Sequence, residues 1–429
     1  MKQQCIHENP SFYIGIMTGN SMDAIDVVYA QINQNQIQPI HTHSIPFTQD
    51  MQQQTVQLRE LVKTCPPRNL LEQNPLFISY HTSYIQQISK AVVELIQQNH
   101  IDVSSIKAIC SHGKTLAHCP SSINPKTPYT LQIGSGKMLA NLIARATNYP
   151  YIRVIYDFRS DDVLNAGEGA PLIPPLNAFI ARQDNCYNRI DINAGNTSNL
   201  CVIQNGTAVA GWDIGPCNEY MDFLIRTHTN QPFDIDGNIG QQGQLDTALL
   251  KELFQINGNF YMTIPPRSGD PAHYNTQRIS AFKNKENLPN LIYTCAYFAA
   301  YIIVHSFQFI QGNIPNHISL FGGGWKHPIL YHSLSQILTG KGFILPEHQL
   351  IFQNILERIQ HPVQIQKHPF SQWMESLLWA KMGYCYDYQI PWTTPQLTNC
   401  RKPTICGIEA VSDINNTNYN DCICRSYPF

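Results

Sequence analysis

One short pattern occurs twice in this chain, and it limits the possible folds more than any other feature. Residues 16–28 read IMTGNSMDAIDVV, and residues 192–203 read INAGNTSNLCVI. In both, a Gly-Asn-Ser/Thr turn joins two apolar runs, which predicts a β-hairpin. Two related hairpins in the two halves of one chain indicate a duplicated domain, with chance similarity of a short turn as the alternative.

The segments around the hairpins alternate between helical and strand patterns, which predicts an α/β architecture. A chain of 429 residues is too long for one compact core, so we expect two domains, at 1–185 and 186–400, with 401–429 as a tail without periodicity. The last helices of the second domain either stay in it or pack back on the first. The predicted elements are helices at 71–99 and 135–148, strands at 106–112 and 151–158, three strands over 188–215, and a strand, triple-glycine turn and helix over 317–338.

Composition argues against several classes of function. The net charge is −2, so no basic surface for nucleic acid is expected. The 13 cysteines include no CxxC pair, which favours free thiols in a reducing cytosol, with Cys422 and Cys424 as incidental thiols on the tail. The N-terminus lacks a signal-peptide pattern, and the apolar run 291–310 is interpreted as a buried helix rather than a membrane span. We therefore expect a cytoplasmic protein without nucleic-acid or membrane partners.

Glycine-rich turns at three places carry the parts of a nucleotide phosphate site. Glycine lets backbone N–H groups come close to phosphate, Ser or Thr adds a hydroxyl donor, and Asp holds Mg²⁺. The turns are Gly19-Asn20-Ser21 with Asp23 and Asp26, Gly195-Asn196-Thr197, and Gly322-Gly323-Gly324 before a helix. No GxxxxGK[ST] motif occurs, so the chain is not a P-loop enzyme. ATP with Mg²⁺ is the predicted cofactor pair.

Four further polar residues stand at strand ends or on an apolar helix. Asp213 ends a strand in GWDIGPCN and is a candidate general base, with helix capping as the alternative. Arg159 suits an anionic substituent or an internal ion pair, and His112 suits a sugar hydroxyl or a structural role. Glu375 lies in the otherwise apolar run QWMESLLWAKMGY, so it is either paired or functional.

Eight motifs, in order, resemble those of the anhydro-N-acetylmuramic acid kinases over nearly the full length of the chain, to about residue 407. They are the first turn GIMTGNSMDAID at 15–26, SHGKT at 111–115, TLQIG at 130–134, the run from Asp157 to Leu172, NAGNTSN at 193–199, the run from Gly211 to Asp222, the triple glycine at 322–324, and MESLLWA at 374–380.

The resemblance implies a two-domain actin-like (ribonuclease H-like) ATPase fold with a central nucleotide and sugar cleft. It implies that ATP and water convert 1,6-anhydro-N-acetylmuramic acid to N-acetylmuramic acid 6-phosphate and ADP in cell-wall recycling, with Asp213 as the general base. A homodimer is also implied. The resemblance implies nucleotide contacts by Gly19, Asn20, Ser21, Met22, Asp23, Ala24, Ile25, Asp26, Gly195, Asn196, Thr197, Gly322, Gly323 and Gly324. It implies metal binding by Asp23 and Asp26. It implies sugar contacts by His112, Gln132, Asp157, Arg159, Gly215, Asn218 and Glu375.

The chain departs from the family pattern inside several of these motifs. Asn20 and Asn196 stand where the family has Thr and Gly, and Lys114 and Glu168 each replace a Gln. Lys114 and Glu168 could pair with each other or reshape the sugar site. Two alternatives therefore stay open: a kinase for another sugar, which Asn177 also favours, or a catalytically weakened paralogue that binds nucleotide or sugar.

Overall fold

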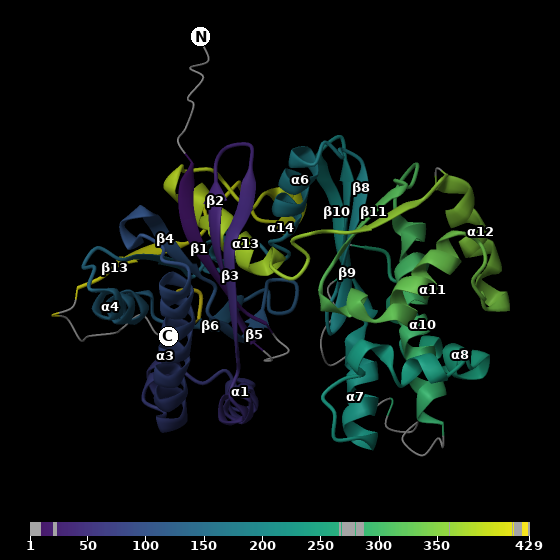
Figure 1. The fold of residues 1–429 in the computed structure, drawn as a ribbon, viewed down its shortest axis with the longest axis horizontal. Coiled ribbons are helices and arrows are strands. Elements are labelled where there is room, and N and C mark those ends of the chain that lie inside the picture. The colour runs from purple at the N-terminus through teal and green to yellow at the C-terminus, as the bar shows by residue number, and fades with distance from the viewer. Residues whose placement is uncertain are drawn as a thin grey trace, which may run out of the picture. The chain divides into compact units, whose positions relative to one another are not determined.

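The chain folds into two compact units. The computed structural model describes residues 10–19, 24–265, 267, 279, 287–359, 361–413, 415 and 423–427. Unit 1 comprises Met1–Leu176 and Trp373–Phe429, and unit 2 comprises Asn177–Gln372 (Figure 1). The boundary expected near residue 185 thus differs from the observed one by nine residues, and residues 373–400 belong to the first unit.

Unit 1 is built on a mixed sheet. In the described residues its strand order is β13-β7-β4-β1-β2-β3. The strands β1, β2 and β3 form an antiparallel meander, β4 and β7 continue parallel to β1, and β13 is antiparallel to β7. The bounds are β1 (Ser11–Thr18), β2 (Ala24–Ile32), β3 (Ile37–Pro46), β4 (Ile106–Ser111), β7 (Arg153–Tyr156) and β13 (Ile408–Val411), with a separate pair β5 (Lys114–Cys119) and β6 (Tyr129–Ile133).

Unit 2 repeats the same topology. Its sheet has the order β10-β9-β8-β11-β12, in which β8, β9 and β10 form an antiparallel meander and β11 and β12 run parallel to β8. Counting only the strands of each main sheet in chain order, both sheets place strands 3, 2, 1, 4 and 5 side by side in that order. This is the ribonuclease H-like arrangement. The duplication predicted from the two hairpins is confirmed. The bounds are β8 (Arg189–Ala194), β9 (Thr197–Gln204), β10 (Thr207–Pro216), β11 (His317–Phe321) and β12 (Gln364–Lys367).

Helices cover the sheets, and those predicted at 71–99, 135–148 and 291–310 are present. The long helix α3 begins after Asn74, whose side chain accepts hydrogen bonds from the N–H groups of Leu76 and Phe77, and Pro75 occupies its first position. The helices are α1 (Gln49–Val62), α2 (Arg68–Glu72), α3 (Pro75–Gln98), α4 (Gly136–Thr147), α5 (Ser160–Leu164), α6 (Pro174–Gln183), α7 (Asn218–His228), α8 (Thr247–Ile256), α9 (Gly258–Met262), α10 (Leu288–Ser306), α11 (Pro328–Leu338), α12 (Gln349–Arg358), α13 (Met374–Asp387) and α14 (Pro395–Thr398).

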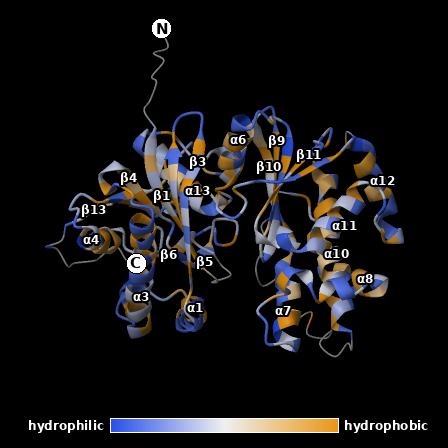
Figure 2. Ribbon diagram, in the orientation of Figure 1, coloured by the Kyte–Doolittle hydropathy of each residue, from blue (hydrophilic) through white to orange (hydrophobic). Residues whose placement is uncertain are grey.

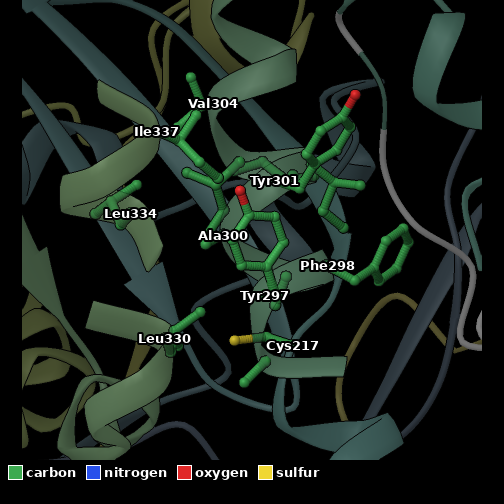
Figure 3. Packing of buried hydrophobic residues seen from close by; sticks show 14 of the residues in the cluster. Cys217, Tyr297, Phe298, Ala300, Tyr301, Val304, Leu330, Leu334 and Ile337 are labelled. Atoms are coloured by element: carbon green, nitrogen blue, oxygen red, sulfur yellow. The ribbon is translucent and has the colours of Figure 1, made fainter. Parts of the chain in front are cut away.

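The apolar run near residue 300 is the central helix of unit 2. Residues Leu288–Phe309 are long and apolar enough to cross a membrane by length and composition, and 78% of the most apolar window is buried inside the protein. Helix α10 packs against α11, and Figure 3 shows Val304 of α10 beside Ile337 of α11. The buried helix predicted here is confirmed. By contrast, α1 is mainly hydrophilic in Figure 2.

Helix α13 approaches the sheet of unit 1 at two glycines. A Cβ on Gly15 of β1 would lie 1.9 Å from the carbonyl oxygen of Ser376, and a Cβ on Gly383 would lie 2.2 Å from Sγ of Cys110. Gly15 opens the first motif, but its lack of a side chain serves helix packing here. This close approach brings Glu375 and Trp379 of α13 to the end of the sheet where β1 and β4 finish.

The C-terminal segment is not a loose tail, and this prediction was wrong. Val411 and its neighbours form β13 at the edge of the unit 1 sheet, with Ile408 paired to Tyr156. Farther on, Ile423, Cys424 and Tyr427 are buried in the core of unit 1. Short-range sequence patterns missed both because their partners lie hundreds of residues away in the chain. The described cysteines are free thiols, as expected; Cys422 lies outside the described residues.

Candidate active site

The first glycine turn follows β1 of unit 1. Asn20, Ser21, Met22 and Asp23 lie outside the described residues. The carbonyl of Gly19 accepts a hydrogen bond of 2.6 Å from Nζ of the fully buried Lys114. Lys114 therefore holds the start of the turn.

Downstream of the turn, Ala24, Ile25 and Asp26 open β2, and Oδ1 of Asp26 accepts a 2.7 Å hydrogen bond from Ser44. The carboxylate of Glu168 accepts hydrogen bonds from Ser121 and Ser122, so it does not serve as the partner that the sequence suggested for Lys114. Within the described part of the chain no group of three or more His, Cys, Asp or Glu side chains could hold a metal ion. The metal role of Asp23 and Asp26 stays a prediction.

His112 lies at the centre of a polar cluster in unit 1. Nε of Arg159 donates a 2.8 Å hydrogen bond to Nε2 of His112, whose Nδ1 lies 3.0 Å from the carbonyl oxygen of Gly113. Nε2 must accept, so the imidazole is neutral and carries its proton on Nδ1. Burial, together with the cationic Arg159, holds the pKa of His112 well below its usual range.

Trp379 of α13 forms one wall of this cluster. Its ring stacks on His112 with the centroids 4.2 Å apart, and the guanidinium carbon of Arg159 lies 5.8 Å from the ring centroid. Burial lowers the pKa of Arg159 to about 10, although the carboxylates of Glu375 and Asp162 favour its charged form. Glu375 and Trp379 are one helical turn apart and so lie on the same face of α13. That spacing was the signal by which sequence analysis could have found Trp379.

A small pocket in unit 1 joins three predicted sugar residues. His112, Gln132 and Asp157 line it, together with residues of the loop that leads into α4, and Cys424 also contributes. Nε2 of Gln132 donates to Thr115 and Thr130, whereas its buried Oε1 has no hydrogen-bond partner among the described residues. An unsatisfied buried acceptor is costly, so this oxygen is well suited to a hydroxyl of a ligand.

Two glycine turns meet at one end of the unit 2 sheet. A Cβ on Gly322 would lie 2.4 Å from the carbonyl oxygen of Ala194, the last residue of β8, and one on Gly324 would lie 2.8 Å from Oδ1 of Asn218. Gly322 has a φ of +92°, which disfavours any side chain. A Cβ on Gly323 would meet no atom of the described residues within 4 Å, so the turn is open at that position. A short 3₁₀ turn at Gly323–Lys326 precedes α11, so the glycines do not directly begin that helix as predicted.

The second hairpin turn is bonded to the start of α7. The carbonyl of Gly195 accepts from the N–H of Asn218, and the carbonyl of Asn196 accepts from the N–H groups of Cys217 and Glu219. These bonds satisfy N–H groups that a helix N-terminus would otherwise leave open. Asn196 is exposed and Thr197 begins β9. Gly215 follows on β10 and its carbonyl accepts from Ser198.

Asp213 lies in the same rung of the unit 2 sheet as these turns. It is opposite Asn199, which is opposite Asn193, which in turn is opposite Phe321, the residue before Gly322. Neighbouring strands are about 4.8 Å apart, and β9 lies between β10 and β8. Asp213 therefore lies about 10 Å from β8, the strand that leads into the Gly195 turn. A register shift between Asp213 and Gly215 marks a bulge, a feature common beside active sites.

Arg267 secures the backbone at Asp213. The N–H of Asp213 donates to the carbonyl of Arg267 (3.1 Å), and Nε of Arg267 donates to the carbonyl of Asp213 (3.0 Å). The guanidinium also donates to the carbonyls of Phe260, Tyr261 and Thr263 around the end of α9. Sequence analysis had not singled out Arg267 for this part.

Neutral His112 gives a testable dependence of stability on pH. A buried histidine with a depressed pKa stabilises the fold fully above its unfolded pKa of about 6.5, and this stabilisation is lost as pH falls. We expect His112 to make the protein about 2 kcal/mol less stable at pH 5.0 than at pH 7.5. Urea denaturation measures the free energy of unfolding at both pH values. Its decrease from pH 7.5 to pH 5.0 should be about 2 kcal/mol smaller in His112→Asn than in the wild type. The exposed His100→Asn serves as control, and equal losses in both variants would refute the assignment.

The repeated ribonuclease H-like unit, with its glycine turns at strand ends, is the architecture of the actin-like ATPases. The family model described as anhydro-N-acetylmuramic acid kinase matches residues 11–411. The chain belongs to the anhydro-N-acetylmuramic acid kinase family. All eight motifs noted in the sequence lie inside the matched range, so the predicted membership is confirmed.

Named relatives agree with this membership. Anhydro-N-acetylmuramic acid kinase of Vibrio vulnificus is 29% identical over 400 residues, covering 92% of this chain and 97% of that protein. That of Bordetella parapertussis is 27% identical over 406 residues, covering 94% and 96%. Among solved structures, component A of (R)-2-hydroxyglutaryl-CoA dehydratase from Acidaminococcus fermentans is 10% identical with a TM-score of 0.41, covering 86% of this chain and 96% of that one. A TM-score this low supports no conclusion.

Proposed function

We propose that this kinase opens 1,6-anhydro-N-acetylmuramic acid with water and phosphorylates O6, giving N-acetylmuramic acid 6-phosphate and ADP in peptidoglycan recycling in the cytoplasm. The observation that carries the proposal is the rung of the unit 2 sheet that aligns Asp213 with the strands ending in the Gly195 and Gly322 turns. A carboxylate at that place can act as a base beside a phosphate site. The family match from 11 to 411 supports the choice of sugar.

In the proposed reaction Asp213 takes a proton from water while the water oxygen attacks the anomeric carbon. The bond from C1 to O6 breaks and its electron pair stays on O6. O6 then attacks the γ-phosphorus of ATP, and ADP leaves with the electron pair of the broken P–O bond. Because the protein forms no covalent intermediate, its contribution is to hold the base, water, sugar and phosphate in line.

The open face at Gly323 fits a phosphate group. A Cβ there would meet nothing, whereas Gly322 and Gly324 are closed against Ala194, so the turn presents backbone to one side only. Gly19, Asn196 and Thr197 would bind phosphate in the same way. Asp23 and Asp26 would hold Mg²⁺, which neutralises phosphate charge when bound. For the sugar we assign His112, Gln132, Asp157, Arg159, Gly215, Asn218 and Glu375.

Assaying the purified protein with ATP, Mg²⁺ and the anhydro-sugar tests the proposal. We expect ADP and sugar phosphate in equal amounts. In H₂¹⁸O, ³¹P NMR should show no ¹⁸O in the sugar phosphate, because O6 comes from the sugar, whereas inorganic phosphate from plain ATP hydrolysis would contain it. Absence of ADP from a protein with a native circular dichroism spectrum would refute the proposal.

A second candidate, a kinase for a different sugar, rests on Lys114 and Glu168, which each replace a Gln of the family pattern. A panel with 1,6-anhydroglucose and N-acetylmuramic acid separates the two. The first lacks the lactyl and acetamido groups, and the second lacks the 1,6-bridge. Faster ADP release with either compound than with the anhydro-sugar would favour the second candidate.

A further inference from the structure

The C-terminal residues Ile423–Tyr427, here called the strap, are built into unit 1. They lie beyond the range 11–411 that the family model matches. Ile423 bridges to Ile133 in antiparallel fashion, and the N–H of Cys424 donates to the carbonyl of Gln132 (3.2 Å). Ser426 exchanges hydrogen bonds with the backbone of Thr130. The strap therefore extends the edge of β6 beside the predicted sugar residue Gln132.

Arg425 of the strap pairs with two carboxylates, one directly after β7 and one in the first turn of α5. Its Nε and backbone N–H donate to Oδ2 of Asp157 (2.8 and 3.0 Å), and its terminal nitrogens donate to both oxygens of Asp161 (3.0 and 2.7 Å). Asp157 has a φ of +56° and is buried, so it needs such support. Its other oxygen, Oδ1, accepts a 2.5 Å hydrogen bond from Ser160.

The same turn carries Arg159 to His112. Residues 157–160 connect β7 to α5, and Ser160 at their end accepts a hydrogen bond from the N–H of Ser426 (3.0 Å). The strap thus holds the turn at both ends, at Asp157 and Ser160. Between these anchors the guanidinium of Arg159 donates to His112 and to the carbonyl of Gly169 (2.6 Å).

We propose that Arg425 is a positioning residue for the sugar site, because it holds the 157–160 turn so that Arg159 stays on His112. The effect on sugar rests on the proposed function, whereas the effect on Arg159 and His112 does not. Arg425 itself touches no predicted sugar group except the carboxylate of Asp157. The strap is then an element of this chain that shapes a site which the matched family region supplies.

Arg425→Met tests the proposal, with Arg425→Lys as the conservative variant. Arg153→Met is the matched control, because Arg153 also bridges two carboxylates, Asp387 and Glu409, at a similar exposure of 31% against 35%. Misplacement of a positioning group weakens productive binding, so we expect Arg425→Met to raise the KM for the anhydro-sugar about tenfold. The KM for ATP should stay unchanged, Arg425→Lys should recover part of the loss, and Arg153→Met should change neither KM.

Imidazole ¹⁵N NMR of the protein without ligand gives a second readout. Wild-type His112 should show one neutral tautomer with the proton on Nδ1, assigned by its loss in His112→Asn. In Arg425→Met the Nε2 signal should move as Arg159 leaves. The proposal would be overturned if Arg425→Met, like Arg153→Met, left both the His112 signals and the ratio of the KM for the anhydro-sugar to the KM for ATP unchanged. If the wild type turns over no anhydro-sugar, the proposed function fails, and the His112 signals alone decide the role of Arg425.

Discussion

Asp213→Asn should lower kcat with the anhydro-sugar by about 10³-fold, because an amide cannot accept the proton of the attacking water. The substitution is nearly isosteric. The two hydrogen bonds between Asp213 and Arg267 at this strand end use the backbone carbonyl and N–H of Asp213, so the fold should persist. ADP release with saturating sugar and ATP measures the effect, and calorimetry should show that ATP still binds.

The matched control is Asp236→Asn, which removes the same charge from an exposed position in unit 2. Asp236 has a φ of +53°, which Asn tolerates, so the control should behave as wild type. Full turnover in Asp213→Asn would remove Asp213 as the base. Loss of turnover in both variants would point to net charge instead of a positioned carboxylate.

Gly322→Ala should destabilise the protein by about 3 kcal/mol, since the left-handed backbone and a clash act together. The new methyl group would lie 2.4 Å from the carbonyl oxygen of Ala194 and 2.7 Å from Oδ1 of Asn193, at a φ of +92°. Relief requires the β8 end or the turn to move, and either change displaces the proposed phosphate site. We therefore expect weaker ATP binding together with a lower melting temperature.

Gly323→Ala separates folding from binding in the same turn. A Cβ there meets nothing within 4 Å, so the melting temperature should stay close to that of wild type. If phosphate binds over the open face of the turn, the affinity of Gly323→Ala for ATP should fall although its stability is normal. Differential scanning fluorimetry and ATP titration of both variants measure the contrast. Equal melting temperatures for Gly322→Ala and wild type would contradict the steric interpretation.

Local pattern predicted much of the fold because the signals are short-range. The two Gly-Asn hairpins identified the first strands of both units, and hydrophobicity alone marked α10 as a core helix. The glycines of 322–324 were also correctly placed after a strand, because tight turns need residues that tolerate positive φ. These features depend on residues close together in the chain.

Partners far apart in the chain were beyond such reasoning. Trp379 reaches His112 only because α13 returns to the first unit and packs on Gly15. Arg425 contacts Asp157 although the two are 268 positions apart in the sequence, and the local pattern CICRSY at 422–427 does not predict that contact. The interpretation of 401–429 as a tail failed for the same reason, since periodicity cannot show a strand that is held by an existing sheet edge.

By itself, the sequence determined the duplicated α/β fold, the family and the residue types of the glycine turns, because backbone conformation and local hydrophobic pattern depend on residues close together in the chain. Only the tertiary structure decided that Lys114 holds the carbonyl of Gly19, that His112 is neutral beneath Arg159, and that the strap holds the turn carrying that arginine. The physical reason is that protonation, ion pairing and burial depend on neighbours in space, which chain order does not specify.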